Sequence, residues 1–256
     1  MQNGNSAFEI AVPKATVTQS RLLAVDIDNH VNLPTGARGN LGPSIDSPRG
    51  SPKDSHKYED YTLLQQHVLF WDRDNDGQIT PIDTYIGFRE LGFNIIFSLL
   101  AVLVINLNFS YPTRLAYSWF PDPFFRVYVP SIHKAKHGSD SGAIDNEGRF
   151  VSQAFENIFA KYDRENRGCL SLADIFRMMK GQRVAADPFG WGAAFFEWGT
   201  TWLLLQKGGM VYKEDLRQVY DGSLFWKIRD KRLKAEGWRQ GFGLGGDGFI
   251  GSVKVT

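Results

Sequence analysis

The chain has 256 residues, enough for one large domain or two small ones. With 43% hydrophobic residues it can bury a sizeable core, and its formal net charge of +1 gives no basic field that would indicate nucleic acid as a partner. The one cysteine, Cys169, excludes an internal disulfide and a zinc cluster and favours a reducing compartment. No basic stretch followed by an apolar run opens the chain, so we expect no signal peptide.

Residues 1–57 are predicted to form a flexible N-terminal arm. Five of the eleven prolines fall in this stretch, with glycine, serine and asparagine between them. Such a composition offers little apolar surface to bury, so ordering it would not be repaid by burial. We therefore expect the first ordered element to begin near Tyr58.

A helix that runs into a calcium loop is predicted over residues 58–90. Three apolar residues and His67 follow one another at the spacing of one helix face: Leu64, His67, Val68 and Trp71. The next twelve residues, DRDNDGQITPID, fit the EF-hand pattern, in which alternating oxygen ligands surround a hard cation and Gly77 allows the sharp turn. The predicted calcium ligands are Asp72, Asp74, Asp76, Gln78 and Asp83.

The twelfth position of this loop departs from the usual pattern. It holds Asp83 instead of glutamate, and the shorter side chain reaches less far toward the ion. We expect weaker calcium affinity, or more tolerance of magnesium, as the consequence. Thr80 as a cap and Pro81 at the first helical position predict that a second helix leaves the loop.

The exit helix leads into an uncharged stretch, the 23 residues 91–113. At about 1.5 Å per residue this stretch reaches roughly 34 Å, against about 30 Å for the hydrocarbon core of a bilayer. Prolines at 112, 121, 123 and 130 are expected to break the helix and bend the chain back. Residues 91–130 are therefore predicted to form a membrane-associating segment with a proline-rich bend. A buried core helix is the alternative, because Asn94, Asn106 and Asn108 are awkward in hydrocarbon.

A C-terminal helical domain is predicted over residues 131–226. The stretch DRENRGCLSLAD, residues 163–174, has the same skeleton as the first loop, but Arg167 stands where a ligand oxygen belongs, which predicts a degenerate, metal-free loop. If the two loops pair through Ile79 and Leu170, the apolar segment is an insertion between the halves of an EF-hand pair. GGMVYKED, residues 208–215, resembles the exit half of a third loop that has no ligand at its start.

The stretch WGAAFFEWGTTWLLLQ has one charge, Glu197, and aromatic residues at helical spacing. A core helix is the default interpretation, and an interfacial helix or the wall of a ligand pocket are the alternatives. A charged and then glycine-rich tail follows over residues 227–256, and its GFGLGG has no preceding strand that would make it a nucleotide-binding loop. The chain has no HExxH or GxSxG motif, so the sequence does not support a zinc hydrolase or a lipase.

Together these patterns predict a mainly α fold. An EF-hand-type helix–loop–helix pair, with one loop degenerate, would be interrupted by a membrane-associating apolar helix and its proline-rich bend. The sequence leaves a homo-oligomer open, because a loop without a partner in its own chain would need a second chain.

Three of the five histidines, His67, His133 and His137, lie in stretches predicted to be ordered. Pattern alone would make each of them a satisfied core residue. However, the stretches LQQHVLFWDRDNDGQITPIDTYIGFRELGFNII, IHKAKHGSDSGAIDNEGRF, DPFGW with EWGTTWLLL, and YDGSLF resemble the caleosin family, the calcium-binding peroxygenases of lipid droplets. The resemblance runs from about Tyr58 to Trp226. The looser spacing of the prolines departs from the plant pattern and suggests a non-plant member.

This resemblance implies a haem b with two essential histidines, His67 and His137, with His133 as the runner-up. It also implies Ca²⁺ as the second cofactor. Family members take an oxygen atom from a fatty-acid hydroperoxide and deliver it to an unsaturated lipid, as epoxidation or hydroxylation. They act at the lipid droplet surface and the endoplasmic reticulum membrane, facing the cytosol, so the expected partner is a lipid monolayer or membrane and not nucleic acid.

The sequence leaves open which histidine is the proximal iron ligand. His67 lies a little more than one helical turn before Asp72, so an ordered calcium loop would fix its helix and make calcium a structural condition for catalysis. The alternative to an enzyme is a non-catalytic calcium-binding protein of the droplet surface, structural or sensory.

Overall fold

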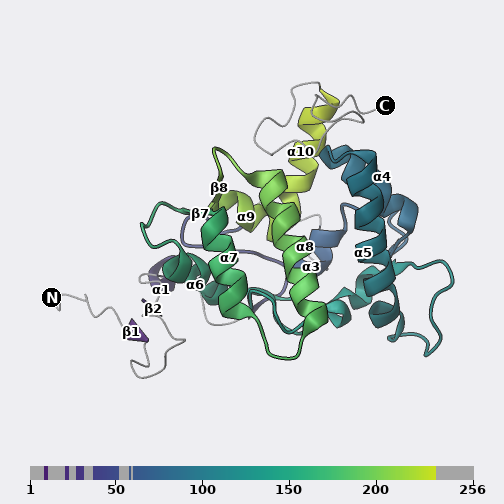
Figure 1. Ribbon diagram of the computed structural model, residues 1–256, viewed down its shortest axis with the longest axis horizontal. Coiled ribbons are helices and arrows are strands. Elements are labelled where there is room, and N and C mark those ends of the chain that lie inside the picture. The colour runs from purple at the N-terminus through teal and green to yellow at the C-terminus, as the bar shows by residue number, and fades with distance from the viewer. Residues whose placement is uncertain are drawn as a thin grey trace.

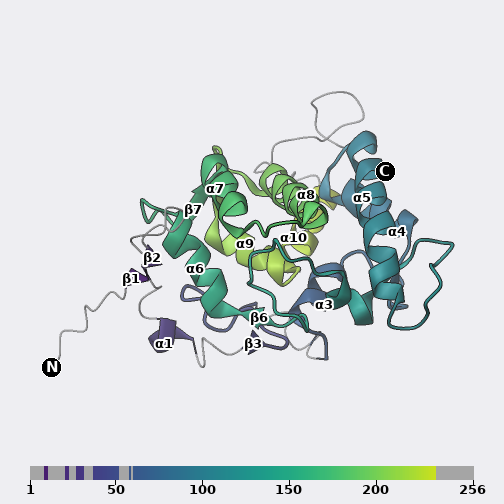
Figure 2. The same ribbon diagram turned by 60° about the horizontal axis from the view of Figure 1, so that its bottom comes forward.

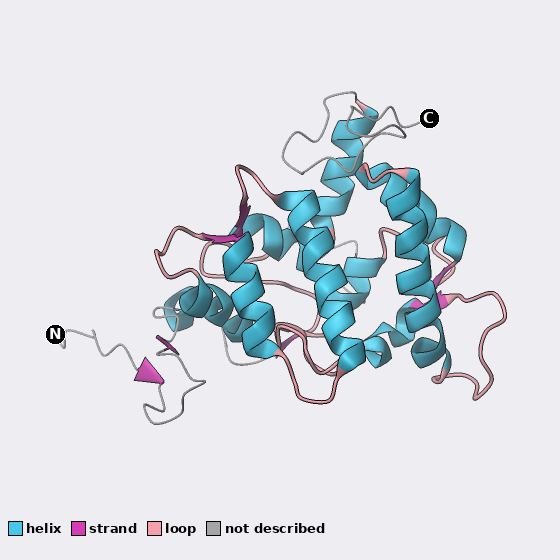
Figure 3. Ribbon diagram, in the orientation of Figure 1, coloured by secondary structure: helices cyan, strands magenta, loops and turns pink. Residues whose placement is uncertain are grey.

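The computed structural model describes residues 27–31, 37–51, 58 and 60–234, and the backbone of two short strands at 9–10 and 21–22. This described part is mainly helical, as predicted, and its strands are short (Figure 3). The helices are α1 (Ile27–His30), α3 (Leu63–Val68), α4 (Pro81–Leu91), α5 (Ile95–Arg114), α6 (Ser152–Tyr162), α7 (Leu172–Gln182), α8 (Pro188–Leu205), α9 (Lys213–Tyr220) and α10 (Ser223–Leu233), with a 3-10 helix η1 at Val129–Ala135.

The described strands form two-residue or three-residue antiparallel pairs. They are β1 (Glu9–Ile10) with β2 (Arg21–Leu22), β3 (Ala37–Arg38) with β6 (Phe150–Val151), β4 (Gln78–Ile79) with β5 (Val127–Tyr128), and β7 (Cys169–Ser171) with β8 (Met210–Tyr212). Both views place α4 and α5 at one side of the molecule and α6 and α7 at the other, with α3, α8, α9 and α10 between them (Figures 1 and 2).

Three helices begin on the same local device, a capping box. The hydroxyl of Thr62, Thr80 or Ser171 accepts a hydrogen bond from the backbone three residues on, and the side chain at that third position returns the bond. Two of the three helices, α4 and α7, are the exit helices of the predicted loops. The sequence therefore determined where these helices begin, through caps that depend only on neighbouring residues.

The two predicted loops share a backbone conformation. Asn75 and Gly77 in the first loop have φ of 58° and 79°, and Asn166 and Gly168 at the same loop positions have φ of 51° and 68°. However, the expected pairing of Ile79 with Leu170 is wrong: Ile79 lies opposite Val127. The chain that returns from the apolar helix passes beside the first loop and supplies that partner.

The partner of the second loop is the half-loop in GGMVYKED. Its Val211 lies opposite Leu170 in the β7–β8 pair. The helix–loop–helix units that pair are thus α6–β7–α7 and α8–β8–α9, both C-terminal to the apolar segment.

Helix α5 carries the predicted membrane-associating stretch. Among the described residues it is the one helix long and apolar enough to cross a membrane, with a mean hydropathy of 1.8 over its best window, of which 22% is buried. The break predicted at Pro112 is wrong, since the helix continues to Arg114. Pro112 lies in the last turn, where its missing N–H removes one backbone hydrogen bond without ending the helix, and the chain turns back after Arg114 instead.

The three asparagines that seemed awkward in this helix all have partners. Asn94 caps its N-terminus, and Asn108 Nδ2 donates to Val104 O over 2.6 Å. The buried Asn106 donates from Nδ2 to Ile79 O at 3.3 Å and to Phe125 O at 3.0 Å. Asn106 therefore joins the apolar helix to the first loop and to the returning chain.

Part of the predicted flexible arm packs against the folded body. In residues 41–51, Gly42 O accepts from Arg217 Nη1 at 3.1 Å, and Ser47 Oγ donates to Glu214 Oε2 at 2.9 Å. Most of the remaining arm, and the tail beyond residue 234, lie outside the described residues. The division of the chain into domains stays a prediction.

Candidate functional site

A cavity of about 750 Å³ lies between α3, α4 and α5 on one side and α8 and α9 on the other. Its walls are mainly apolar, with contributions that include Val68, Trp71, Phe88, Leu91, Ile105, Phe109, Trp198, Leu204, Leu216 and Phe225. This volume and lining are typical of a site for a sizeable flat or chain-like apolar ligand.

Two of the three candidate histidines line this cavity. His67 reaches it from α3 and His137 from the segment after η1, whereas His133 is not among the described residues that line it. Polar groups that sequence reasoning missed converge there too, among them Ser141, Glu197 and Tyr220. Glu197 had a signal, as the single charge in an apolar stretch; Ser141 and Tyr220 had none beyond their place in quoted motifs.

His67 is held as a neutral imidazole. Its Nδ1 lies 2.7 Å from Val219 O, and since a carbonyl only accepts, Nδ1 carries the proton. Burial lowers the pKa of His67, against the opposing effects of the Val219 hydrogen bond and of the Glu197 and Asp221 charges. Its Nε2 therefore keeps a lone pair, which is the state of a metal-ligating histidine whose other nitrogen is fixed by a carbonyl.

His137 has the opposite character. Its side chain is 5% exposed and its Nε2 lies 3.5 Å from Glu197 Oε2. Burial disfavours its charged form, but the hydrogen bond and charge of Glu197, together with Asp140 and Asp187, raise its pKa above the ordinary value. Its Nδ1 is buried without a hydrogen-bond partner among the described residues. His137 is thus suited to hold and release a proton.

The residues QQH at the start of the site each have a different task. Gln65 closes the capping box of α3, and Gln66 Nε2 donates to Asn40 O over 2.8 Å. Both glutamines fix the helix on which His67 stands. The α3 helix has only six residues, so these contacts and its packing, more than intrinsic propensity, hold it in place.

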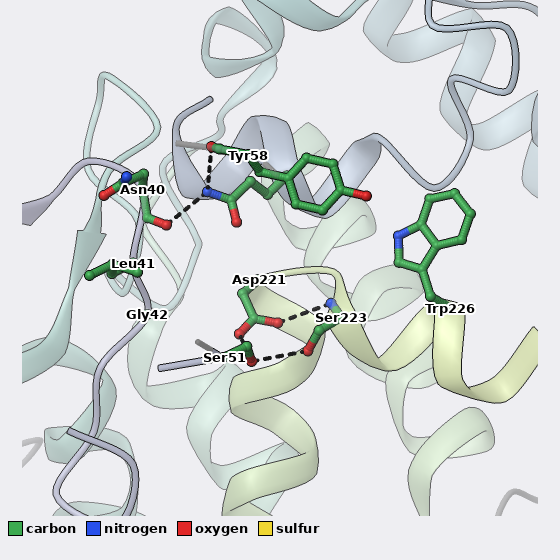
Figure 4. Close-up of a pocket in the computed structure, with 9 residues that line it drawn as sticks. Asn40, Leu41, Gly42, Ser51, Tyr58, Asp221, Ser223 and Trp226 are labelled. Carbon is green, nitrogen blue, oxygen red and sulfur yellow. Dashed lines mark hydrogen bonds between the residues drawn. The ribbon is translucent and has the colours of Figure 1, made fainter. Parts of the chain in front are cut away.

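A second, much smaller pocket lies beside α3, where residues 40–51 meet α9 and α10 (Figure 4). Ser51 Oγ donates to Asp221 Oδ2 at 2.5 Å and accepts from the buried Arg217, whose Nη2 is 3.0 Å away. Ser223 Oγ lies 3.2 Å from Ser51 Oγ. These bonds fix the end of α9, and with it the Val219 carbonyl that orients His67.

Trp71 connects His67 to the calcium loop. It precedes Asp72 directly, its ring centroid is 6.1 Å from that of His67, and it packs edge-on against Phe225 at 5.0 Å. On its other side it lies against Gly87 of α4, where an added Cβ would stand 2.3 Å from Trp71 Cδ1. The loop, its exit helix and the histidine are therefore packed as one unit.

The first loop brings three of its five predicted ligands together. One carboxylate oxygen each from Asp72, Asp74 and Asp76 lies within 4.8 Å of the others. Asp72 Oδ2 accepts from Gly77 N at 3.0 Å, but its Oδ1 is buried with no hydrogen-bond partner among the described residues. A buried, unpartnered carboxylate oxygen among two further carboxylates fits a divalent cation.

The other two predicted ligands are placed differently. Asp83 Oδ2 accepts from Thr80 N at 2.9 Å and from Thr80 Oγ1 at 2.6 Å, so this carboxylate serves the capping box of α4. Gln78 turns its side chain to Asp76, with Nε2 donating to Oδ2 over 3.2 Å. Asp83 does not belong to the described cluster of acidic groups that could hold an ion. The ligand predicted at Gln78 is a carbonyl oxygen, and its role stays a prediction.

The second loop contains its own cation. The Arg167 guanidinium lies 3.7 Å from Asp163 Oδ1, 3.4 Å from Glu165 Oε2 and 3.2 Å from Asp174 Oδ2. These carboxylates occupy positions 1, 3 and 12 of the loop, where ion ligands stand in a functional EF-hand. Arg167 thus neutralises the ligand positions from within, and the absence of a metal from this loop stays a prediction.

Comparison with known proteins matches the chain to one family. The family model described as "Caleosin related protein" matches residues 59–229. A peroxygenase of Lilium longiflorum is 36% identical over 223 residues, covering 86% of this chain and 90% of the relative. Probable peroxygenase 4 of Arabidopsis thaliana is 39% identical over 178 residues, covering 68% and 89%.

A third relative carries a different description. A probable inactive peroxygenase-like protein of Arabidopsis thaliana is 32% identical over 148 residues, covering 57% of this chain and 69% of the relative. No solved structure matches the chain significantly.

Proposed function

This chain belongs to the caleosin family, and we propose that it is a haem- and calcium-dependent peroxygenase that moves an oxygen atom from a fatty-acid hydroperoxide to an unsaturated lipid. The peroxygenase class rests on the lily and Arabidopsis relatives, which match over most of this chain. In the proposed reaction the hydroperoxide leaves as the alcohol and the alkene becomes an epoxide, or a C–H bond becomes a hydroxyl. The observation that carries the proposal is the opposed state of the two histidines in one apolar cavity.

His67 is the residue that would hold the iron of haem b. Its Nε2 lone pair faces no competing proton, because Nδ1 is committed to Val219 O. The apolar walls suit a porphyrin. Lys136 also lines the cavity, where it is ion-paired with Asp140. Bound haem supplies the redox chemistry that cleaves the O–O bond and transfers the oxygen.

His137 is proposed as the proton-transfer residue. A hydroperoxide must lose its proton before the O–O bond breaks, and the alcohol must regain one afterwards. Glu197 raises the pKa of His137 and so favours the protonated form after that first transfer. Two permanently bound histidines would leave no open position, so assigning the iron to His67 and the proton to His137 satisfies both needs.

Calcium is proposed to act through Trp71 and not on the substrate. A cation held by Asp72, Asp74 and Asp76 would fix the residue next to Trp71 in sequence. Trp71 in turn packs against Gly87 and beside His67. Loss of the ion would loosen this packed unit and release the helix that carries the iron ligand.

The proposed location is a lipid droplet surface or the cytosolic face of the endoplasmic reticulum. The length and composition of α5 support lipid association, and large side chains in the following turn are exposed: Tyr117, Trp119, Phe120, Phe124 and Phe125. Exposed apolar patches of this size mark interaction sites. Substrate lipids concentrate in the same layer.

EGTA titration of the pure protein tests whether calcium is needed for haem binding and turnover. We expect the Soret absorbance and cumene-hydroperoxide-driven epoxidation to fall together as calcium is removed, and both to return when it is restored. If both survive complete calcium removal, the structural role of the ion is wrong.

The alternative is a non-catalytic calcium-binding protein of the droplet surface. It is supported by the relative described as a probable inactive peroxygenase-like protein. One stoichiometric calcium with no haem uptake would support this alternative over the enzyme.

A further inference from the structure

The cavity that holds the two histidines opens to the outside between α5 and α8. Three large apolar side chains both line it and are strongly exposed: Leu100 on α5 at 46%, and Phe189 and Phe195 on α8 at 45% and 62%. A side chain that lines the cavity and is also exposed to solvent lies at the opening of the cavity, which we call its mouth. The rim of this mouth is therefore apolar.

Helices α5 and α8 lie side by side (Figures 1 and 2). Leu100, Val104 and Asn108 recur every fourth residue and turn one stripe of α5 to the cavity. At one end, the rings of Phe97 and Phe196 stack at 5.9 Å and 13°, which closes the gap between the helices there. The opening lies beyond this stack, along the middle of α5.

The outer surfaces beside the mouth are apolar on both helices. On α5 the exposed residues include Ile95, Ile96, Leu99, Leu103 and Leu107. On α8 they include Trp191 with Phe189 and Phe195. The single charged residue of this helix, Glu197, lines the cavity beside His137 and has a side chain that is 47% exposed. A mouth that admitted solutes from water would gain nothing from such a rim.

Trp191 marks where this surface meets water. Its indole Nε1 donates to Val184 O at 2.7 Å, and the guanidinium of Arg183 lies over its ring at 5.1 Å. A tryptophan with a cation over one ring face and a hydrogen-bonded indole N–H is typical of the boundary between hydrocarbon and headgroups. It stands near the N-terminus of α8, so Phe195 and most of the helix lie on the hydrocarbon side of it.

We infer that α8 is a second lipid-contacting helix, and that the cavity opens sideways into the lipid layer between α5 and α8. The occupant of this surface is the acyl region of a phospholipid layer. An acyl hydroperoxide then reaches the histidines from the hydrocarbon, without crossing water. The substrate in this statement rests on the proposed function, whereas the lipid contact of α8 does not.

Site-directed fluorescence quenching tests the lipid contact. In a Cys169→Ser background, full-length Phe195→Cys and Phe176→Cys proteins would each carry one bimane label in phosphatidylcholine vesicles with brominated acyl chains. Phe176 on α7 is a matched control, because it is 49% exposed and is not among the described residues that line the cavity. We expect strong quenching at 195 and little at 176.

Equal, weak quenching at both positions would overturn the inference. So would a label at 195 that is shielded by a second copy of the chain, seen as excimer or cross-link formation at that position. Because quenching needs neither haem nor turnover, its result stands even if the proposed function fails.

Substrate entry has a separate test in kinetics. Phe195→Asp places a charge on the rim, and we expect the ratio of KM for a vesicle-dissolved fatty-acid hydroperoxide to KM for cumene hydroperoxide added from water to rise about tenfold or more. Phe176→Asp is expected to leave that ratio unchanged. A ratio that does not move in Phe195→Asp, with quenching at 195 intact, would reject the lateral entry while keeping the lipid contact.

Discussion

Replacing Gly87 with alanine tests how tightly the calcium loop and His67 are joined. The new Cβ would lie 2.3 Å from Trp71 Cδ1 and 2.4 Å from Trp71 Nε1, closer than side-chain atoms approach. The indole is hemmed in by Phe88 and Phe225, at ring-centroid distances of 5.7 Å and 5.0 Å. Overpacking of this kind typically costs about 1–3 kcal/mol.

The matched control is Gly199→Ala in α8, where nothing lies within 4 Å of an added Cβ. Both substitutions gain roughly 1 kcal/mol of helix propensity, because glycine is unfavourable inside a helix. The difference between the two variants therefore isolates the overpacking, about 1–3 kcal/mol. At about 2–4 °C per kcal/mol for a chain near this size, Gly87→Ala should melt about 2–12 °C below Gly199→Ala.

Thermal unfolding of the full-length, detergent-solubilised proteins, followed by circular dichroism, gives this difference directly. Calcium titration of the same samples gives the second readout, and we expect weaker binding in Gly87→Ala alone. Equal melting temperatures and equal calcium affinities would refute the packing of Trp71 against α4 as the link between loop and histidine.

Three further outcomes follow from the contacts described above. Arg167→Asp removes the internal cation and adds a carboxylate, so calorimetry should count one more calcium per chain than in wild type. The control, Arg167→Gln, should add none. An unchanged calcium count in Arg167→Asp would show that Arg167 does not stand in for the ion. Glu197→Gln removes the charge that raises the pKa of His137. Because His137 must be neutral to accept a proton, the rising limb of the pH–rate profile should move to lower pH. A limb that stays in place would show that His137 is not the proton-transfer residue. Asn106→Leu deletes the donor to Ile79 O and Phe125 O, so it should lower stability by about 1–3 kcal/mol and weaken calcium binding. The control, Leu103→Ala on the exposed face of α5, should leave calcium binding unchanged. Calcium binding as tight as in wild type in Asn106→Leu would argue against a connection between α5 and the first loop.

Short-range patterns in the sequence predicted much of this fold. The loop DRDNDGQITPID and the cap Thr80 depend only on residues a few positions apart, and the structure has Thr80 as the predicted cap. The Ser171 cap has the same local origin, although the sequence analysis did not name it. The second loop was identified from the same spacing, and Arg167 marked it as degenerate. That Arg167 contacts three carboxylates could not be read from spacing, because a missing ligand and an internal cation look the same in a sequence.

Long-range features were harder to predict. The strands β4 and β7 are two and three residues long, so they hold no register signal that could decide between Val127 and Leu170 as the partner of Ile79. A proline is unfavourable inside a helix, yet α5 continues through Pro112 to Arg114, and residue type alone does not predict this.

The candidate site shows the same division. His67 and His137 came from family resemblance, and a lone histidine on an apolar face would otherwise have been assigned to the core. Glu197 and Tyr220 become site residues only through tertiary packing of α8 and α9 against α3 and α5. The tautomer of His67 is fixed by a backbone carbonyl 152 positions away and its neutral state is favoured by burial, and no local pattern reports either.

The most direct test of the central claim is the visible spectrum of the protein, expressed with ample haem supply and compared with three single variants. We predict a Soret band with about one haem per chain in wild type, and no Soret band in His67→Val. In His137→Val the Soret band should remain while turnover is lost. His133→Val should keep full haem content and activity, because His133 is not among the described residues that line the cavity. A Soret band that persists unchanged in His67→Val, or a correctly folded wild-type protein that takes up no haem, would contradict the assignment of His67 as the iron ligand.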